Sequence, residues 1–325
     1  MHNFPQLQRL FLAYLEQNQF QSKPHNLYAP VNYIMELGGK RARPVLLLLG
    51  YQLFDDHVAR ALPAAYAIEL FHNFSLVHDD IMDEAPLRRG RPAVHERYGT
   101  NAGILSGDVM LIYVYQFLLQ VDRPDLLPEL LQTFNQTAIG VCEGQQYDVD
   151  FEQRNDVTIP EYLHMIELKT AILLAAALKI GGMIGGANAE QAQHLYEFGR
   201  NIGLAFQVQD DLLDTFGDPE KFGKKVGGDI AQNKKTLLFL QAQAVANEHQ
   251  RAELDQLFFG TGVGEAQKIA RVTELFVECG VKESAAVLQR QYQATAFEHL
   301  AAVGVGQERK APLIELAELL LGRES

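Results

Sequence analysis

The sequence predicts an all-α protein: a large helical bundle that forms one domain over residues 1–325. Apolar residues recur at spacings of three and four, which is typical of amphipathic helices, whereas the alternating pattern of half-buried strands is rare. Proline and glycine fall mostly between these periodic blocks. The length alone would suggest about two domains. However, no composition shift or low-complexity linker marks a boundary, so we expect a single domain.

Two helices are well marked. The first is predicted by apolar residues at helical spacing between Leu7 and Leu15. The second begins at Thr158, where Glu161 completes a capping box and Pro160 lies in the first turn. We expect it to run to the glycine pair at 181–182. Its second half, residues 171–180, is apolar except for Lys179, which predicts a buried central helix.

Composition limits the class of protein. The formal net charge of −13 argues against a protein that follows a nucleic-acid backbone. Two cysteines far apart make neither a metal motif nor a disulfide framework, which is typical of a reducing compartment. The apolar stretches at 10–15 and 171–178 are much shorter than the about 20 residues of a membrane-spanning helix. The N-terminus does not resemble a signal peptide. We therefore expect a cytoplasmic protein without a membrane span.

Two acidic clusters carry the strongest chemical signal. Asp-Asp-Ile-Met-Asp at 79–83 recurs as Asp-Asp-Leu-Leu-Asp at 210–214, each after an apolar helical block. On a helix the first and last aspartates share a face, and the middle one lies about 100° away. Carboxylates at a helix C-terminus repel one another and the helix dipole, and divalent cations offset both penalties. Oxygen ligands suit Mg²⁺. The predicted metal ligands are Asp79, Asp80, Asp83, Asp210, Asp211 and Asp214. A solvated acidic turn is the alternative, and the second copy disfavours it.

Basic residues cluster near these motifs. They occur in the segments 38–44, 88–92, 169–170, 223–229 and 233–236. Arginine forks and lysine charges suit phosphate oxygens, although each patch taken alone would be interpreted as solvated surface. Lys169 differs because its helix is mostly apolar, and Glu167 lies about 200° away around the helix. His72 shares a face with Asp79, and Gln207 shares one with Asp210. Together these features favour a substrate with a diphosphate head and a long hydrocarbon tail.

With these motifs, the sequence resembles the trans-isoprenyl diphosphate synthases, the polyprenyl synthetase family. The matching pieces run in family order from residue 38 to 236, and both aspartate motifs are complete. The resemblance implies an all-α isoprenoid synthase fold with a deep central apolar cavity, a homodimer and Mg²⁺ as cofactor. It also implies head-to-tail condensation of isopentenyl diphosphate with an allylic diphosphate. The allylic C–O bond ionises, the isopentenyl double bond attacks the cation, and the released diphosphate takes the proton.

The resemblance also implies roles for individual residues. Asp79 and Asp83, together with Asp210 and Asp214, would bind the Mg²⁺ that bridges the allylic diphosphate. The residues implied to hold that allylic substrate are Arg88, Lys169, Thr170, Gln207, Lys224 and Lys234. Those implied to bind isopentenyl diphosphate are Lys40, Arg43, His72 and Arg89. We expect Asp79, Asp83, Asp210, Lys169 and Arg88 to carry the catalytic step.

Product length is expected to follow from the residues before the first aspartates. In this family a bulky residue five positions before them tends to form the cavity floor, here Phe74, and the next residue is the small Ser75. By helical projection Ser75 lies closest to the Asp79 face, and Phe71 is a second bulky candidate. One aromatic with one small neighbour resembles the geranylgeranyl-forming pattern. We predict a C20 product, with C15 as the alternative and long polyprenyl chains least favoured.

Other classes match less well. Terpene cyclases generally pair their aspartates with an Asn/Ser/Glu motif and lack the Gly-Gly-Lys-Arg segment, which this chain has at 38–41. A squalene-type synthase is disfavoured for the same reason. A non-catalytic regulatory subunit usually loses one aspartate motif, and a metal buffer would not explain Lys169. The sequence does not fix the allylic primer, the oligomeric state or the role of residues 248–306.

Overall fold

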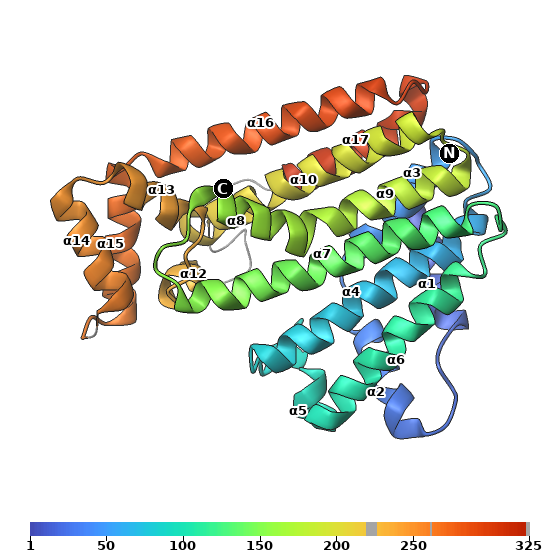
Figure 1. Cartoon of the computed structure of the whole chain (residues 1–325), viewed down its shortest axis with the longest axis horizontal. Helices are drawn as coiled ribbons and strands as arrows, with labels where there is room; N and C mark the ends of the chain where they lie inside the picture. Colours follow the sequence, from blue (N-terminus) through green and yellow to red (C-terminus); the bar gives the residue numbers. More distant parts are fainter. Residues whose placement is uncertain (219–225, 261, 323–325) are drawn as a thin grey trace. The chain divides into compact units, whose positions relative to one another are not determined.

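The computed structural model describes residues 1–218, 226–260 and 262–322, and it confirms the all-α prediction. Within these residues helices are joined by short loops, and the strands that occur form one short hairpin (Figure 1). The elements are α1 Phe4–Gln17, α2 His25–Glu36, α3 Ala42–Gln52, η1 Val58–Ala61, α4 Leu62–Met82, β1 Leu87–Arg88, β2 Arg91–Pro92, α5 Val94–Tyr98, α6 Thr100–Leu118, α7 Leu127–Gln153, α8 Ile159–Ile166, η2 Glu167–Ala171, α9 Ile172–Gly185, α10 Ala189–Phe216, α12 Gly228–Ala231, α13 Leu237–Val245, α14 Glu248–Phe259, α15 Glu265–Glu278, α16 Val281–Ala302 and α17 Gln307–Leu321.

The chain divides into two compact units. Unit 1 consists of Met1–Thr137, Leu173–Tyr196 and Ala302–Ile314. Unit 2 consists of Ala138–Ile172, Glu197–Ala301 and Glu315–Ser325. The first aspartate motif therefore belongs to unit 1 and the second to unit 2. A single domain over the whole chain stays a prediction.

Unit 1 is built around α4, which packs along α6 and α3 (Figure 1). The apolar run of α3 is wholly buried, as its continuous leucines require. The predicted helix break at 181–182 is wrong, because α9 continues to Gly185. A side chain at Gly181 would clash with the carbonyl of Leu47, and at Gly185 its Cβ would lie 2.6 Å from the carbonyl of Tyr51. These glycines thus allow α9 to approach the backbone of α3 closely.

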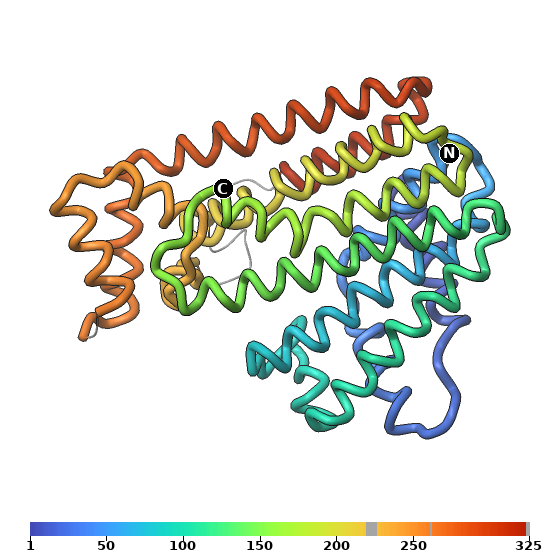
Figure 2. Tube along the Cα trace, viewed as in Figure 1, coloured from blue at the N-terminus to red at the C-terminus, as the bar shows by residue number. Residues whose placement is uncertain are grey.

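Unit 2 has its own apolar core, to which α8, α13, α14 and α15 contribute (orange in Figure 2 from α13 onward). Leu237, Leu254, Val272 and Leu275 are fully buried there. This core includes α13 to α15, most of which lies in the segment 248–306 whose role the sequence leaves open. Within the described residues, α15 of this core also packs against α12.

The capping box at Thr158 is confirmed: its side chain accepts from the backbone N–H of Glu161, and that glutamate reaches back to the N–H of Thr158. The helix it starts contains one π-helical turn, η2, between α8 and α9. Residues 159–185 are long and apolar enough to cross a membrane by length and composition, but 72% of their apolar window is buried inside the structure. Burial of that kind is typical of a core helix, and the absence of a membrane span stays a prediction.

Candidate active site

The first aspartate motif lies at the C-terminal end of α4, as predicted. Asp80 is fully buried, and Arg88 Nε donates to its two carboxylate oxygens at 2.9 and 3.1 Å. Asp79 is half-buried and Asp83 is exposed, and the two share a helix face. The structure therefore gives the predicted metal ligand Asp80 a different partner, an arginine. Asp79 and Asp83 are the other two carboxylates of this motif, and they are its candidate metal ligands.

A hairpin positions the two arginines that follow. Strands β1 and β2 pair Arg88 with Arg91, and the turn residues Arg89 and Gly90 both have positive φ, 52° and 75°. Sequence analysis missed this hairpin because its turn is Arg-Gly rather than Asn-Gly or Asp-Gly. Arg89 Nη1 donates to the carbonyl of Gly38, and a Cβ on Gly39 would lie 3.0 Å from Arg89 Cζ. Arg89 thus lies directly on the glycine loop at 38–39.

Arg43 and His72 also meet, with Arg43 Nη1 3.1 Å from His72 Nε2. Burial, and then the charges of Arg43 and Arg89, hold the pKa of His72 well below its usual value. The imidazole is therefore neutral and accepts from Arg43. Burial lowers the pKa of Arg43 to about 10, with Arg89 acting in the same direction. Arg43 Nε has no hydrogen-bond partner within the described part of the chain, and Lys40 is exposed on the same loop. Arg43, His72 and Arg89 thus lie near one another, and Lys40 belongs to the loop that Arg89 contacts, an arrangement that suits a diphosphate.

The second aspartate motif ends α10. Asp211 is buried and accepts from Tyr162 Oη at 2.7 Å and from the backbone N–H of Leu237 at 3.2 Å. Burial raises the pKa of Asp211 to about 8. Asp214 Oδ2 accepts from the backbone N–H of Asp229 at 3.0 Å. As in the first motif, the middle carboxylate is buried against structural partners, and Asp210 and Asp214 are the candidate ligands of this motif.

Lys169 lies in the π-helical turn η2. Its Nζ is 2.5 Å from Asp148 Oδ2 on α7, while Glu167 pairs with Arg200 instead. Sequence analysis missed Asp148 because its proximity depends on how α7 packs against η2. Thr170, in the same turn, and Gln207, on α10, are half-buried. A π-helical turn is often found at functional sites because it shifts side chains off the regular helix pattern.

The loop before α13 carries two lysines with different roles. Lys234 is exposed, with Nζ 3.9 Å from Asp229 Oδ1. Lys235 Nζ donates to the carbonyls of Phe151 and Glu152, at 2.8 and 3.0 Å, and so caps the C-terminus of α7. Lys234 is thus the lysine that remains available to a substrate. The predicted substrate-binding residue Lys224 lies outside the described residues.

The remaining carboxylates fit Mg²⁺ only together with other ligands. Among the residues that the structure describes, no group of three or more His, Cys, Asp or Glu side chains is arranged to hold a metal. Each motif nevertheless has two carboxylates besides its buried middle one, and Mg²⁺ is usually bound by one or two carboxylates together with water and substrate phosphates. Neither motif includes a His or Cys side chain, and the charged donors are all carboxylates, so the donor chemistry suits a hard ion.

Aromatic side chains form a row beside the first motif. Phe74 is half-buried, with its ring centroid 5.6 Å from that of Phe71 and 4.8 Å from that of His78. Phe71 is buried and packs edge to face on Phe134 of α7 at 5.2 Å. Ser75 donates its hydroxyl to the carbonyl of His72 at 2.9 Å. Phe74 and Phe71 thus share one packed row, while Ser75 is bonded to its own helix.

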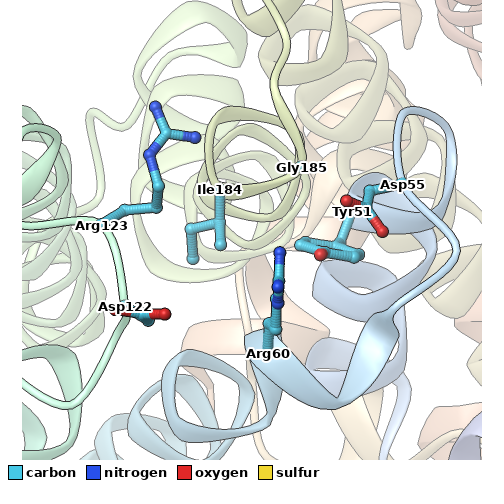
Figure 3. Close-up of a pocket in the computed structure, with 7 residues that line it drawn as sticks. All are labelled: Tyr51, Asp55, Arg60, Asp122, Arg123, Ile184 and Gly185. Atoms are coloured by element: carbon cyan, nitrogen blue, oxygen red, sulfur yellow. The ribbon is translucent and has the colours of Figure 1, made fainter.

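A polar pocket of unit 1 contains none of the predicted residues. Tyr51, Asp55, Arg60, Asp122, Arg123, Ile184 and Gly185 line it (Figure 3). Tyr51 shares hydrogen bonds with Asp55 and Arg60, which act on its pKa in opposite directions. Arg123 pairs with Asp125, which does not line the pocket. Because none of the predicted site residues lines it, we assign this pocket a structural role. The predicted deep apolar cavity stays a prediction.

Comparisons with known proteins agree with this site. A sequence model of the polyprenyl synthetase family matches residues 24–276. Geranylgeranyl diphosphate synthase of Methanosarcina mazei is 38% identical over 304 residues, 93% of this chain and 91% of that protein. Geranylfarnesyl diphosphate synthase of Natronomonas pharaonis is 40% identical over 238 residues, 68% of this chain and 70% of that protein. A crystal structure of a geranylgeranyl pyrophosphate synthase shares 42% identity and a TM-score of 0.93, covering 100% of both chains. The chain therefore belongs to the polyprenyl synthetase family of trans-isoprenyl diphosphate synthases and is a trans-prenyltransferase.

Proposed function

We propose that the protein condenses isopentenyl diphosphate with an allylic diphosphate to make C20 geranylgeranyl diphosphate. The observation that carries the proposal is the cationic group of Lys40, Arg43, His72 and Arg89, in which a neutral imidazole and an unpartnered Arg43 Nε lie among like charges. Such a group favours a ligand with several negative oxygens. The similarity to geranylgeranyl diphosphate synthases over almost the whole chain supports the same substrate class.

Each substrate is assigned its own set of residues. Isopentenyl diphosphate is held by the cationic group just named. The allylic diphosphate is held by Arg88, Lys169, Thr170, Gln207, Lys224 and Lys234. Lys169 pairs with Asp148, and Arg88 pairs with Asp80. These carboxylates hold the two cationic side chains in place, and the allylic diphosphate either replaces the carboxylate or shares the cation with it. The positive charge is therefore in place before the substrate arrives.

The chemistry follows from this charge distribution. The allylic C–O bond breaks with both electrons on the departing diphosphate, whose growing negative charge Arg88 and Lys169 stabilise. The double bond of isopentenyl diphosphate then forms the new C–C bond, and the released diphosphate takes the proton that is lost. Mg²⁺, when bound, supplies Lewis-acid neutralisation of phosphate charge. The carboxylates proposed to hold it are Asp79 and Asp83 in unit 1 and Asp210 and Asp214 in unit 2.

We propose Phe74 as the residue that limits product length, with Phe71 behind it. Support comes from the packed aromatic row, in which Phe71 is fixed against Phe134 and Phe74 is fixed against Phe71. A C25 product is the second candidate, because the geranylfarnesyl diphosphate synthase of Natronomonas pharaonis is as similar over the part it covers. A C15 product would require a floor closer to the aspartates than Phe74.

We also propose a homodimer that uses α6. Leu105 and Ile112 of α6 and Leu119, its C-cap residue, recur every seven residues, and each is more than half exposed. Seven residues are two helical turns, so the three side chains form one apolar stripe. A second copy of the chain would remove this stripe from water. Sedimentation should give a dimer for the wild type and a monomer for Ile112→Glu, and a monomeric wild type would refute this assembly.

A cytoplasmic location also stays a prediction.

The test of the function is product analysis. The protein is incubated with Mg²⁺, isopentenyl diphosphate and each of the C5, C10 and C15 allylic diphosphates, and the dephosphorylated products are identified by mass. We expect one C20 alcohol, no product with EDTA, and recovery when Mg²⁺ is restored. The Asp79→Ala variant should lose turnover and keep its assembly, whereas a regulatory subunit or metal buffer would show no elongation even as wild type. A C15 or C25 alcohol would leave the reaction intact and overturn the assigned length.

A further inference from the structure

One arginine of the glycine loop at 38–43 does not face solvent. Arg41 is buried and has a positive φ of 52°, an unfavourable backbone conformation for a residue with a side chain. Its Nη2 donates to the carbonyl of Met35, and its Nη1 lies 2.5 Å from Glu69 Oε1 on α4. Arg41 therefore ties the loop to the core of unit 1.

Glu69 is the buried partner and is itself held in one orientation. Its carboxylate accepts from Asn73 Nδ2 at 3.1 Å, and the same amide donates to the carbonyl of Glu69 at 2.8 Å. Both charged side chains of the pair are only 2% exposed. A buried ion pair is poor evidence for stability, because taking two charges out of water offsets their attraction. Stability alone therefore does not explain why Arg41 and Glu69 are paired in the core.

The position of Glu69 indicates that it acts on the neighbouring arginines. It supplies the negative charge that opposes the lowering of the pKa of Arg43 and Arg89. Asp80 does the same for Arg89 and pairs with Arg88. Eleven residues separate Glu69 and Asp80, which is close to three helical turns, so one face of α4 carries both counter-charges. This face holds together arginines that would otherwise repel one another.

We propose that Glu69 and Arg41 are positioning residues for the isopentenyl diphosphate site. Arg41 fixes the backbone where the loop that carries Lys40 joins the first turn of α3, which carries Arg43. Glu69 holds Arg41 in place and keeps the arginine cluster together before an anion arrives. Neither residue touches substrate. This inference rests on the proposed function, because it concerns the residues assigned there to isopentenyl diphosphate.

The first test compares single variants. Glu69→Gln keeps the shape and removes the charge, and Arg41→Met removes the fork. We expect each to raise the KM for isopentenyl diphosphate by about tenfold or more, which corresponds to the lower part of the range for hydrogen bonds to charged groups. The kcat and the KM for the allylic diphosphate should change by less than about threefold. Glu36→Gln is the matched control, since it removes the same charge at an exposed position of unit 1.

A double variant separates positioning from stability. Arg41→Met with Glu69→Leu leaves no unpaired buried charge, so its thermal stability should return close to wild type while the raised KM persists. Recovery of both stability and KM would show that the pair only stabilises the fold, and would overturn the proposal. Inorganic diphosphate gives a readout without turnover. Its affinity by calorimetry should fall in Glu69→Gln, and an unchanged affinity would refute the inference. If the wild type binds diphosphate but makes no prenyl product, the proposed function fails separately.

Discussion

Lys169 Nζ and Asp148 Oδ2 lie 2.5 Å apart, so the lysine at the π-helical turn is already paired in the free protein. The allylic diphosphate must compete with Asp148 for this charge. We expect Lys169→Met to lower kcat/KM by about 10- to 150-fold, the value of one hydrogen bond to a charged group. Asp148→Asn should change it by less than about threefold, because the lysine loses a competitor as well as a support. Steady-state kinetics with varied allylic diphosphate measures both, and an equal loss in the two variants would show that Asp148 is needed to position Lys169.

Asp79 is half-buried and Asp80 is fully buried, so loss of the charge should change the Mg²⁺ requirement in one case and the free energy of unfolding in the other. Asp79→Asn is expected to raise the Mg²⁺ concentration for half-maximal activity, because it removes a proposed ligand. Asp80→Asn should leave that concentration near wild type and lower the free energy of unfolding by about 1–3 kcal/mol, since its partner Arg88 loses a charge-assisted bond. Magnesium titrations and urea unfolding distinguish the two. A similar rise in the Mg²⁺ requirement for Asp80→Asn would restore it as a ligand.

The buried neutral His72 makes stability depend on pH. Its pKa in the folded protein is held well below the ordinary value of 6.5 by burial and by Arg43, so the unfolded chain binds more protons between these two values. The free energy of unfolding therefore falls as the pH falls below 6.5, by at most about 1.4 kcal/mol per pH unit from this group, and levels off below the folded pKa.

Urea unfolding at pH 7.5 and 5.5 tests this sign. The wild type should lose more stability between the two pH values than His72→Gln, in which the titrating group is gone. His25→Gln, a change of the same type at an exposed position of α2, is the control and should behave like the wild type. Equal slopes for wild type and His72→Gln would show that His72 titrates normally in the folded protein.

Much of the fold followed from the sequence because local signals agreed with packing. The capping box at Thr158 and the apolar run at 171–178 both predict what the structure contains. The predicted break at Gly181 was wrong for a reason that local rules do not include. Its glycine serves close approach to α3 rather than a turn, and this depends on which helix packs beside it.

The candidate site likewise combines features that local sequence patterns predict with contacts that depend on packing. The spacing of Asp79 and Asp83 predicts one helix face. In the structure Asp79 lies in the last turn of α4, and Asp83 is its C-cap, with its N–H bonded to the carbonyl of Asp79. The different role of the middle aspartates was not predictable, because Arg88 reaches Asp80 from a hairpin and Tyr162 reaches Asp211 from α8. Arg88 follows Asp80 by eight residues but reaches it across a turn, and Tyr162 is 49 residues from Asp211, so helical spacing signals neither contact.

Shortening the aromatic row should change the product. Phe74→Ala removes the ring next to Phe71, and we expect products longer than C20 to appear, because the growing chain meets no bulky group at that position. Mass analysis of the prenyl alcohols measures the shift. Ser75→Ala is the matched control, since its hydroxyl is bonded within its own helix, and it should keep the wild-type product. A C20 product from Phe74→Ala would remove Phe74 as the floor and leave Phe71 as the next residue to test.

A lysine of α15 contacts the loop before α13. Lys268 of α15 is buried beside the ring of Phe258, and its Nζ donates to Asn233 Oδ1. Asn233 has a positive φ of 58° and directly precedes the proposed substrate-binding Lys234. Lys268 thus holds Asn233, in the loop before α13, in a backbone conformation that is unfavourable without this contact. This contact assigns part of segment 248–306 the role of supporting the loop.

Lys268→Met keeps the length of the side chain and removes its donor, so we expect the KM for the allylic diphosphate to rise about fivefold, a loss near the net value of one hydrogen bond. The KM for isopentenyl diphosphate should stay unchanged, because its proposed residues lie in unit 1. Lys268→Arg retains a donor and should recover part of the effect, and Lys282→Met, an exposed lysine of α16, is the control. If Lys268→Met raises both KM values equally, or lowers thermal stability with no change in either, α15 supports the fold of unit 2 without positioning Lys234.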